Sequence, residues 1–197
     1  MNNIIFSNGK IHKLNISDLN NVQKEVQNFI KEQREGYLLF SFPKTVCIKG
    51  STTSDVDVSN SKANAVPVVK LFHEGGTIIA SPSDVEIGIF TKGFKANDIM
   101  SEIIHDISEI LSEKGFESEI TGNDLLVEGK KVLGCGSRKF GEIVFGAMHI
   151  SLENNTELIN KICTKTCIKT PTGLKQYNLS TQNIIDLCQQ IFTRYFK

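Results

Sequence analysis

The stretch GNDLLVEGKKVLGCG, residues 122–136, decides how the whole chain is interpreted. Asn123 and Asp124 open an apolar segment typical of a strand, and Gly129 turns it back into a second one. Lys131 lies in the second segment among apolar residues, where an ammonium is costly unless an anion or a carbonyl lies beside it. The stretch therefore predicts a hairpin that either holds a lysine against a polar partner or simply ends in basic residues exposed to solvent.

Two glycines follow in the same predicted strand, Gly134 and Gly136, and such positions let a backbone approach a ligand closely. Cys135 lies between them, where its thiol either lines the pocket of that ligand or packs in the core. Cys47 and Cys188 fall on apolar faces of a predicted strand and helix and are expected in the core. The cysteines number five, which is odd, so no disulfide framework is predicted.

Outward from this hairpin, hydrophobic periodicity predicts many strands and few helices. Strands are expected at residues 3–6, 37–42, 45–49, 66–72, 77–80, 85–91, 116–120, 124–128, 131–136 and 143–152. Helices are expected at residues 18–33, 97–114 and 155–162 and from residue 181 onwards. Residues 50–64, rich in Ser, Thr, Asp and Asn, are predicted to form a mobile loop. This order predicts an α+β fold of mixed, largely antiparallel sheets with about three long helices packed on them, formed as one domain by residues 1–197.

The composition argues against several classes of function. Lys and Arg together number 22, as do Asp and Glu, so no overall positive field exists to attract nucleic acid or a membrane surface. No apolar run approaches the ~20 residues that cross a bilayer, and the N-terminus lacks a signal-peptide pattern. We therefore expect a cytoplasmic protein. Cys163 and Cys167 have no second Cys or His cluster beside them, so no metal site is predicted.

The hairpin resembles the signature of the lipoate–protein ligase and octanoyltransferase family, N-D-hydrophobic-x-V-x-G-x-K-hydrophobic-x-G. The resemblance implies the class II synthetase-like fold of the biotin and lipoate ligases. It also implies that Lys131 contacts the carbonyl of an acyl group, and that Asn123 and Asp124 lie near the phosphates and Mg²⁺ in an ATP-using member. Biotin is not expected as the substrate, because the Trp typical of biotin ligases is absent.

Residues 66–85 resemble the glycine-rich loop that binds the acyl group in this family. The resemblance makes five residues candidates for the acyl site, namely Val69, Lys70, His73, Gly75 and Gly76. Lys70 stands where the family has an arginine. Glu74 and Ser83 replace glycines of the family pattern, and Ala80 replaces its histidine. These departures leave open a protein that has kept the fold and lost the chemistry.

The resemblance implies one of three functions. In the first, Cys163, or else Cys167, takes an octanoyl or lipoyl group from an acyl-carrier protein as a thioester, and Lys131 lowers the pKa of the thiol. The acyl group then passes, without a cofactor, to the lysine of a lipoyl domain or of a glycine-cleavage H-type carrier protein. In the second, an ATP-dependent lipoate ligase uses ATP and Mg²⁺. In the third, a non-catalytic protein binds a lipoyl domain, octanoate or lipoate.

Chain length and the position of Cys163 favour the transferase among these functions. The histidines contribute little to the choice. His105 falls on a predicted helix and His149 on a predicted strand, and both are interpreted as structural.

Overall fold

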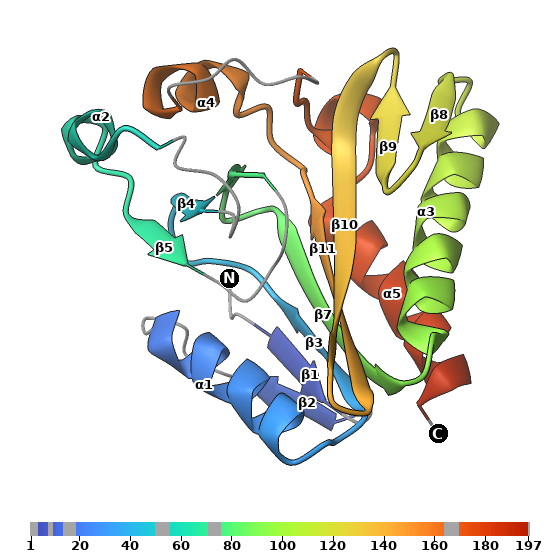
Figure 1. The fold of residues 1–197 in the computed structure, drawn as a ribbon. Coiled ribbons are helices and arrows are strands. Elements are labelled where there is room, and N and C mark those ends of the chain that lie inside the picture. The colour runs from blue at the N-terminus through green and yellow to red at the C-terminus, as the bar shows by residue number, and fades with distance from the viewer. Residues whose placement is uncertain are drawn as a thin grey trace.

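The computed structural model describes residues 4–7, 10–13, 19–49, 56–70, 76–163 and 170–196, and Figure 1 shows its fold. At its centre lies a six-stranded antiparallel sheet, the large sheet, in the order β3-β7-β11-β10-β9-β8. Its strands are β3 (Gly36–Phe40), β7 (Val85–Lys92), β8 (Ser118–Thr121), β9 (Asp124–Val127), β10 (Lys130–Phe140) and β11 (Ile143–Ile150). Each of these strands was predicted, and β10 extends beyond its predicted end because it pairs with β11 as far as Phe140.

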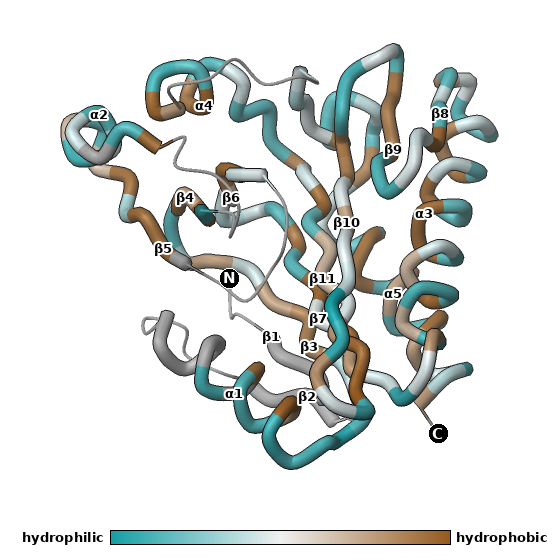
Figure 2. Tube along the Cα trace, viewed as in Figure 1, coloured by the Kyte–Doolittle hydropathy of each residue, from teal (hydrophilic) through white to brown (hydrophobic). Residues whose placement is uncertain are grey.

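Two long helices, α3 (Lys95–Glu113) and α5 (Thr181–Tyr195), cover one face of the large sheet (Figure 1). Their apolar residues recur at helical spacing, visible in Figure 2 as alternating hydrophobic and hydrophilic segments along α3. The buried residues of α3 are Ala96, Ile99, Met100, Ile103, Ile104, Ile107 and Leu111. Those of α5 are Ile184, Cys188, Ile191 and Phe192. The predictions of both helices, and of a buried Cys188, are confirmed.

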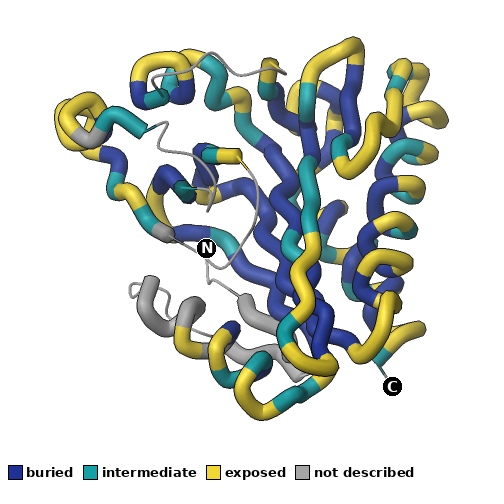
Figure 3. Tube along the Cα trace, in the orientation of Figure 1, coloured by how far each residue is buried: buried dark blue, intermediate teal, exposed yellow. Residues whose placement is uncertain are grey.

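The opposite face packs against α1 (Leu19–Lys31) and a three-stranded sheet, the small sheet, in the order β5-β4-β6. In the small sheet, β4 (Val46–Lys49) is parallel to β5 (Val68–Lys70) and antiparallel to β6 (Ile78–Ala80). Phe29 of α1 stacks on Phe90 of β7, with ring centroids 4.6 Å apart. Figure 3 shows that β7 and β11 are buried along their length, whereas much of β10 is only partly covered.

The remaining elements are short. A hairpin of β1 (Ile4–Ser7) and β2 (Lys10–Lys13) lies near the N-terminus, α2 (Val58–Ala63) lies beside α4 (Thr156–Ile162), and the 3-10 helix η1 (Leu174–Tyr177) precedes α5. The sequence predicted neither β2 nor η1. No helix in the described ranges is long and apolar enough to cross a membrane.

The prediction of a mobile loop at residues 50–64 is wrong for α2. Asp57 caps this helix, because its carboxylate accepts hydrogen bonds from the backbone N–H groups of Ser59 and Asn60 at 2.8 and 3.0 Å. Residues 50–55 lie outside the described part of the chain.

Candidate active site

A β-bulge in β10 determines which way the lysine of the hairpin points. The register between β10 and β9 shifts between Lys131 and Leu133, so Val132 is an extra residue in the strand. Val132 and Leu133 are consequently both fully buried in the core beneath α3 and α5. In a regular strand, residues three apart face opposite sides of the sheet. The bulge therefore brings Lys131 and Gly134 to one face, the face that carries α1 and the small sheet.

Four residues form a cross-strand row on this face, which we call the charged row. From β9 to β7 it consists of Asp124, Gly134, His149 and Glu86, each directly opposite the next. Directly opposite Cβ atoms in antiparallel strands are only about 4.5–5.5 Å apart, so their side chains interact. The row thus places two carboxylates and an imidazole around the position of one glycine.

Lys131 is held above that glycine. Its Nζ lies 2.7 Å from Asp124 Oδ1, and a Cβ built on Gly134 would come within 2.5 Å of the same nitrogen. The Lys131 side chain is 32% exposed, so solvent or a ligand can reach it. Of the alternatives that the sequence left open for Lys131, the structure shows a polar partner, Asp124, and the glycine provides the room for the pair.

The segment after α4 fixes the backbone of Lys131. The N–H of Lys131 donates to Thr170 O, and its carbonyl accepts from the N–H of Thr172, both at 2.8 Å. This short parallel pairing occupies the main-chain groups of Lys131 at the bulge. The lysine therefore projects from a backbone fixed on both sides, which limits the positions that its ammonium can take.

At the other end of the charged row, His149 links Glu86 to Ser151. His149 Nδ1 lies 2.6 Å from Glu86 Oε1, and His149 Nε2 lies 2.9 Å from Ser151 Oγ. All three residues are buried. Burial lowers the pKa of His149, but the charge and hydrogen bond of Glu86 and the charge of Asp84 outweigh it, so this pKa lies above its usual value, although Lys131 opposes the rise.

Asp84 ties the loop before β7 to the chain that leaves β11. Its Oδ1 accepts hydrogen bonds from the backbone N–H groups of Leu152 and Glu153 at 2.6 and 3.1 Å, and its Oδ2 accepts from the N–H of Ser81 at 2.7 Å. Burial raises the pKa of the Asp84 carboxyl, although His149 and these N–H groups act to lower it. The backbone beside Ser151 is thereby fixed.

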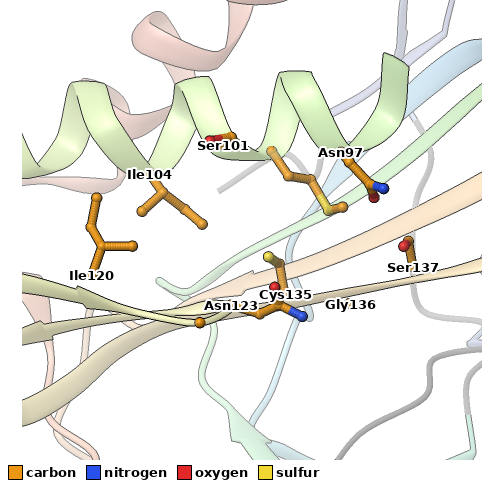
Figure 4. Close-up of a pocket in the computed structure, with 10 residues that line it drawn as sticks. Asn97, Ser101, Ile104, Ile120, Asn123, Cys135, Gly136 and Ser137 are labelled. Carbon is orange, nitrogen blue, oxygen red and sulfur yellow. The ribbon is translucent and has the colours of Figure 1, made fainter. Parts of the chain in front are cut away.

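A pocket of about 380 Å³ lies on the other face of the large sheet, between α3 and the hairpin (Figure 4). Met100 and Ile104 of α3 line it from one side. Asn123, Cys135 and Gly136 line it from the hairpin, so Cys135 borders a pocket, but not the space around Lys131.

The thiol of Cys135 is not set up as a nucleophile. Burial raises its pKa to about 11, and Asp124 adds to the rise while Lys131 lowers it. The thiol is therefore protonated near neutral pH.

The structure separates Asn123 from Asp124, which the family resemblance placed together. Asn123 borders the pocket beneath α3, and its carbonyl accepts a hydrogen bond from the N–H of Cys135 at 2.9 Å. Asp124 belongs to the charged row on the opposite face. Of the predicted site residues in the hairpin, Lys131, Asp124 and Gly134 are brought together.

Cys163 ends α4 in an apolar cluster beside the small sheet. The cluster consists of Cys47, Val66, Ile79, Ile159 and Ile162, and Cys163 packs against it. Burial raises the pKa of Cys47 to about 12 and nearby Cys163 adds to the rise, so the two thiols are neighbours. Cys47 is buried, as expected. A thioester at Cys163 stays a prediction, and Cys167 lies outside the described residues.

The predicted acyl-binding loop is described only in part. Val69 packs against the core between the large sheet, α1 and the small sheet. Lys70 is the last residue of β5, and Gly76 is exposed shortly before β6. His73 and Gly75 lie outside the described residues.

The link from Glu86 through His149 to Ser151 was not predicted from the sequence. Glu86 and His149 are 63 residues apart, and only the register of β7 against β11 joins them. A polar residue near one end of each of two apolar strands was the available signal, because buried charged groups need partners.

By sequence alone, the chain matches no protein-family profile and no curated protein. Its structure is similar to that of LipL1 from P. falciparum in complex with lipoate, with a TM-score of 0.69 and 17% identity over 90% of this chain, which spans 57% of LipL1. It is also similar to the bi-partite lipoate protein ligase of T. acidophilum, with a TM-score of 0.71 and 11% identity over 88% of this chain and 78% of the other. A third similar structure is lipoate-protein ligase A bound with ATP, with a TM-score of 0.69 and 12% identity over 85% of this chain and 76% of the other. The chain therefore has the fold of the lipoate–protein ligases, as the resemblance of its hairpin implied.

Proposed function

We propose that this protein attaches an octanoyl or lipoyl group to the lysine of a lipoyl carrier domain. The observation that carries the proposal is the partly exposed ammonium of Lys131, held against Asp124 above Gly134. An ammonium has three N–H donors, so it can bind Asp124 and an acyl carbonyl oxygen together. A positive charge at that oxygen stabilises the oxyanion that develops when a nucleophile attacks the carbonyl.

The surface beside Lys131 suits an acyl chain. Next to the charged row lies a second row of small residues on the same face, in which Gly136 is opposite Ala147 and Ala147 is opposite Gly88. Ala147 and Val69 both pack against the apolar core on this face. The small residues Gly136 and Ala147 leave room for methylene groups beside the sheet, and apolar contact favours their burial. The space over Gly88 is taken by the rings of Phe145 and Phe90.

The acyl donor of this reaction is proposed to be a carrier-bound thioester, as in the octanoyltransferases. The fold also supports a second candidate, an ATP-dependent ligase, and Asp124 favours it because carboxylate oxygens are ligands for Mg²⁺. In that reaction Asp124 would hold the metal, which would supply charge for the phosphates, and Lys131 would bind the acyl carbonyl.

One pair of assays tests the proposal and separates the candidates. The protein is mixed with an unmodified lipoyl domain and either octanoyl-acyl-carrier protein without ATP, or lipoate with ATP and Mg²⁺. Intact mass spectrometry of the lipoyl domain then shows which donor is used. Lys131→Ala should abolish transfer, whereas Lys130→Ala should retain it, because Lys130 is exposed. No transfer from either donor would instead favour a binding protein.

A further inference from the structure

The hydrogen-bonded chain from Glu86 through His149 to Ser151 has the geometry of a nucleophile, a base and a group that orients the base. A carboxylate only accepts hydrogen bonds, so His149 Nδ1 carries the proton that is shared with Glu86 at 2.6 Å. In the neutral imidazole, Nε2 is then the acceptor. The hydroxyl of Ser151 therefore donates to Nε2 across 2.9 Å, which is the contact that a histidine base makes with a serine nucleophile.

The backbone that carries the Ser151 side chain is fixed by hydrogen bonds. The N–H of Ser151 donates to Val132 O at 2.8 Å, and its carbonyl accepts from the N–H of Leu174 at 2.9 Å. Asp84 holds the next N–H along the chain, that of Leu152. A fixed backbone limits the positions that the Ser151 hydroxyl can take relative to His149.

The lysine of the candidate active site lies beside this chain. The Nζ of Lys131 occupies the space where a Cβ of Gly134 would be, and Gly134 is directly opposite His149. The Lys131 charge acts on the imidazole, because it opposes the net rise in the pKa of His149 that Glu86 and Asp84 produce against burial. The serine, its base and a cation suited to a carbonyl oxygen therefore lie on one face of the sheet.

We infer that Ser151, activated by His149, is the nucleophile that carries the acyl group in the proposed transfer, as an oxygen ester. Glu86 is a positioning residue, because it touches His149 and not the substrate. The inference rests on the proposed function and replaces Cys163 in its chemical step. It fits the position of Cys163, whose neighbours form an apolar cluster that includes the buried Cys47.

In the first step, Ser151 Oγ attacks the carbonyl carbon of an acyl thioester, and its proton passes to His149 Nε2. The C–O bond forms, the C–S bond breaks, and the departing sulfur takes the proton from Nε2. In the second step, the amine of the carrier lysine attacks the ester carbon. The C–N bond forms, the C–O bond breaks, and His149 passes a proton from the amine to the serine oxygen. Lys131 stabilises the oxyanion in both steps.

The linkage chemistry of the acyl-enzyme tests this inference directly. The protein is treated with octanoyl-acyl-carrier protein or with p-nitrophenyl octanoate, quenched, and divided between neutral hydroxylamine and buffer. Thioesters are cleaved by neutral hydroxylamine, whereas oxygen esters of serine resist it. We expect a resistant octanoyl adduct on the tryptic peptide of residues 140–161, which contains Ser151 and excludes Cys163.

Variants complete the test. Ser151→Ala should lose the adduct, and Ser151→Cys should regain it in a hydroxylamine-sensitive form. Ser137→Ala is the matched control, because Ser137 lies in the same sheet and borders the pocket beneath α3. His149→Asn should slow the p-nitrophenol burst by about 10²–10⁴-fold, the usual contribution of a general base. Glu86→Gln should slow the burst without changing KM, and circular dichroism checks that each variant is folded.

The outcomes separate the inference from the proposed function. An adduct that hydroxylamine removes, or that persists in Ser151→Ala, overturns the inference. Transfer to the lipoyl domain by Ser151→Ala at the wild-type rate overturns it as well and leaves the proposed function intact. A Ser151 ester formed from p-nitrophenyl octanoate, with no transfer to a lipoyl domain from either acyl donor, supports only the activation of Ser151 by His149 and overturns the proposed function.

Discussion

Lys131 and Asp124 form their 2.7 Å ion pair because Val132 is an extra residue in β10. Without the bulge, the alternation of side chains would turn Lys131 towards the core beneath α3 or move Gly134 from under its ammonium. The pair therefore depends on backbone register as much as on the two charges.

Gly134→Ala should abolish acyl transfer while the protein stays folded. The added methyl would overlap the Lys131 ammonium, which would have to leave Asp124. The displaced atoms are the end of a flexible, partly exposed side chain, so the cost is that of a lost ion pair, at most about 1 kcal/mol, and denaturant titration measures it. In a Lys131→Ala background the same change should cost little, because the atom that it displaces is gone. An equal cost in both backgrounds would contradict this account of the glycine.

Asp124→Asn should separate the two acyl donors. With octanoyl-acyl-carrier protein, the variant should retain transfer at a reduced rate, since Lys131 keeps its charge but loses its ionic partner. With lipoate, ATP and Mg²⁺, it should lose the dependence of rate on Mg²⁺ concentration if the carboxylate holds the metal. Initial rates across a Mg²⁺ titration provide the measurement, and Asp186→Ala, on the exposed side of α5, is the control.

Asp84→Ala should destabilise the fold by about 2–4 kcal/mol, because it leaves buried backbone N–H groups without an acceptor. The carboxylate accepts from three such groups, and Asp84 is 1% exposed. Chemical denaturation monitored by circular dichroism gives the loss, compared again with Asp186→Ala. A midpoint equal to that of the wild type would show that the loop before β7 does not need this anchor.

The pair of His149 and Glu86 should make stability depend on pH. The folded-state pKa of His149 is raised above 6.5, so its protonation stabilises the native state fully below pH 6.5. This stabilisation is lost as pH rises through the folded-state pKa. A double variant, His149→Gln with Glu86→Gln, keeps an uncharged hydrogen-bonded pair and should lack this part of the dependence. Parallel pH profiles of the free energy of unfolding for the two proteins would contradict the prediction.

The fold was largely predictable because its main signals are local. The helices α3 and α5 have long apolar stripes, and the hairpin of residues 122–136 has a turn glycine between two apolar strands. Hydrophobic periodicity does not predict the short helix α2, because its sequence is VSNSKA. Its local signal is the capping residue Asp57. The local composition favoured a loop at these residues, but the capping side chain of Asp57 stabilises a helix there.

The candidate site was predictable only where one segment contains it. The anionic partner of Lys131 is seven positions earlier in the same hairpin, and a polar partner was one of the two alternatives that the sequence left open. The bulge was hidden, so it was not evident that Lys131 and Gly134 lie on one face of the sheet. The partner of His149 is Glu86 of another strand. The pairing of β7 with β11, which brings the two residues together, cannot be predicted from the sequence of either strand alone.

The bulge also makes the strand sensitive to the deletion of a residue. Removing one residue between Lys131 and Gly134 would exchange the inner and outer sides of the strand end. Such a deletion would force an ammonium into an apolar core. The number of residues between Lys131 and Gly134 is therefore as important to the position of the ammonium as their identity. Other chains with the same site are therefore expected to have a lysine followed by a glycine three positions later, whatever the two residues between them are.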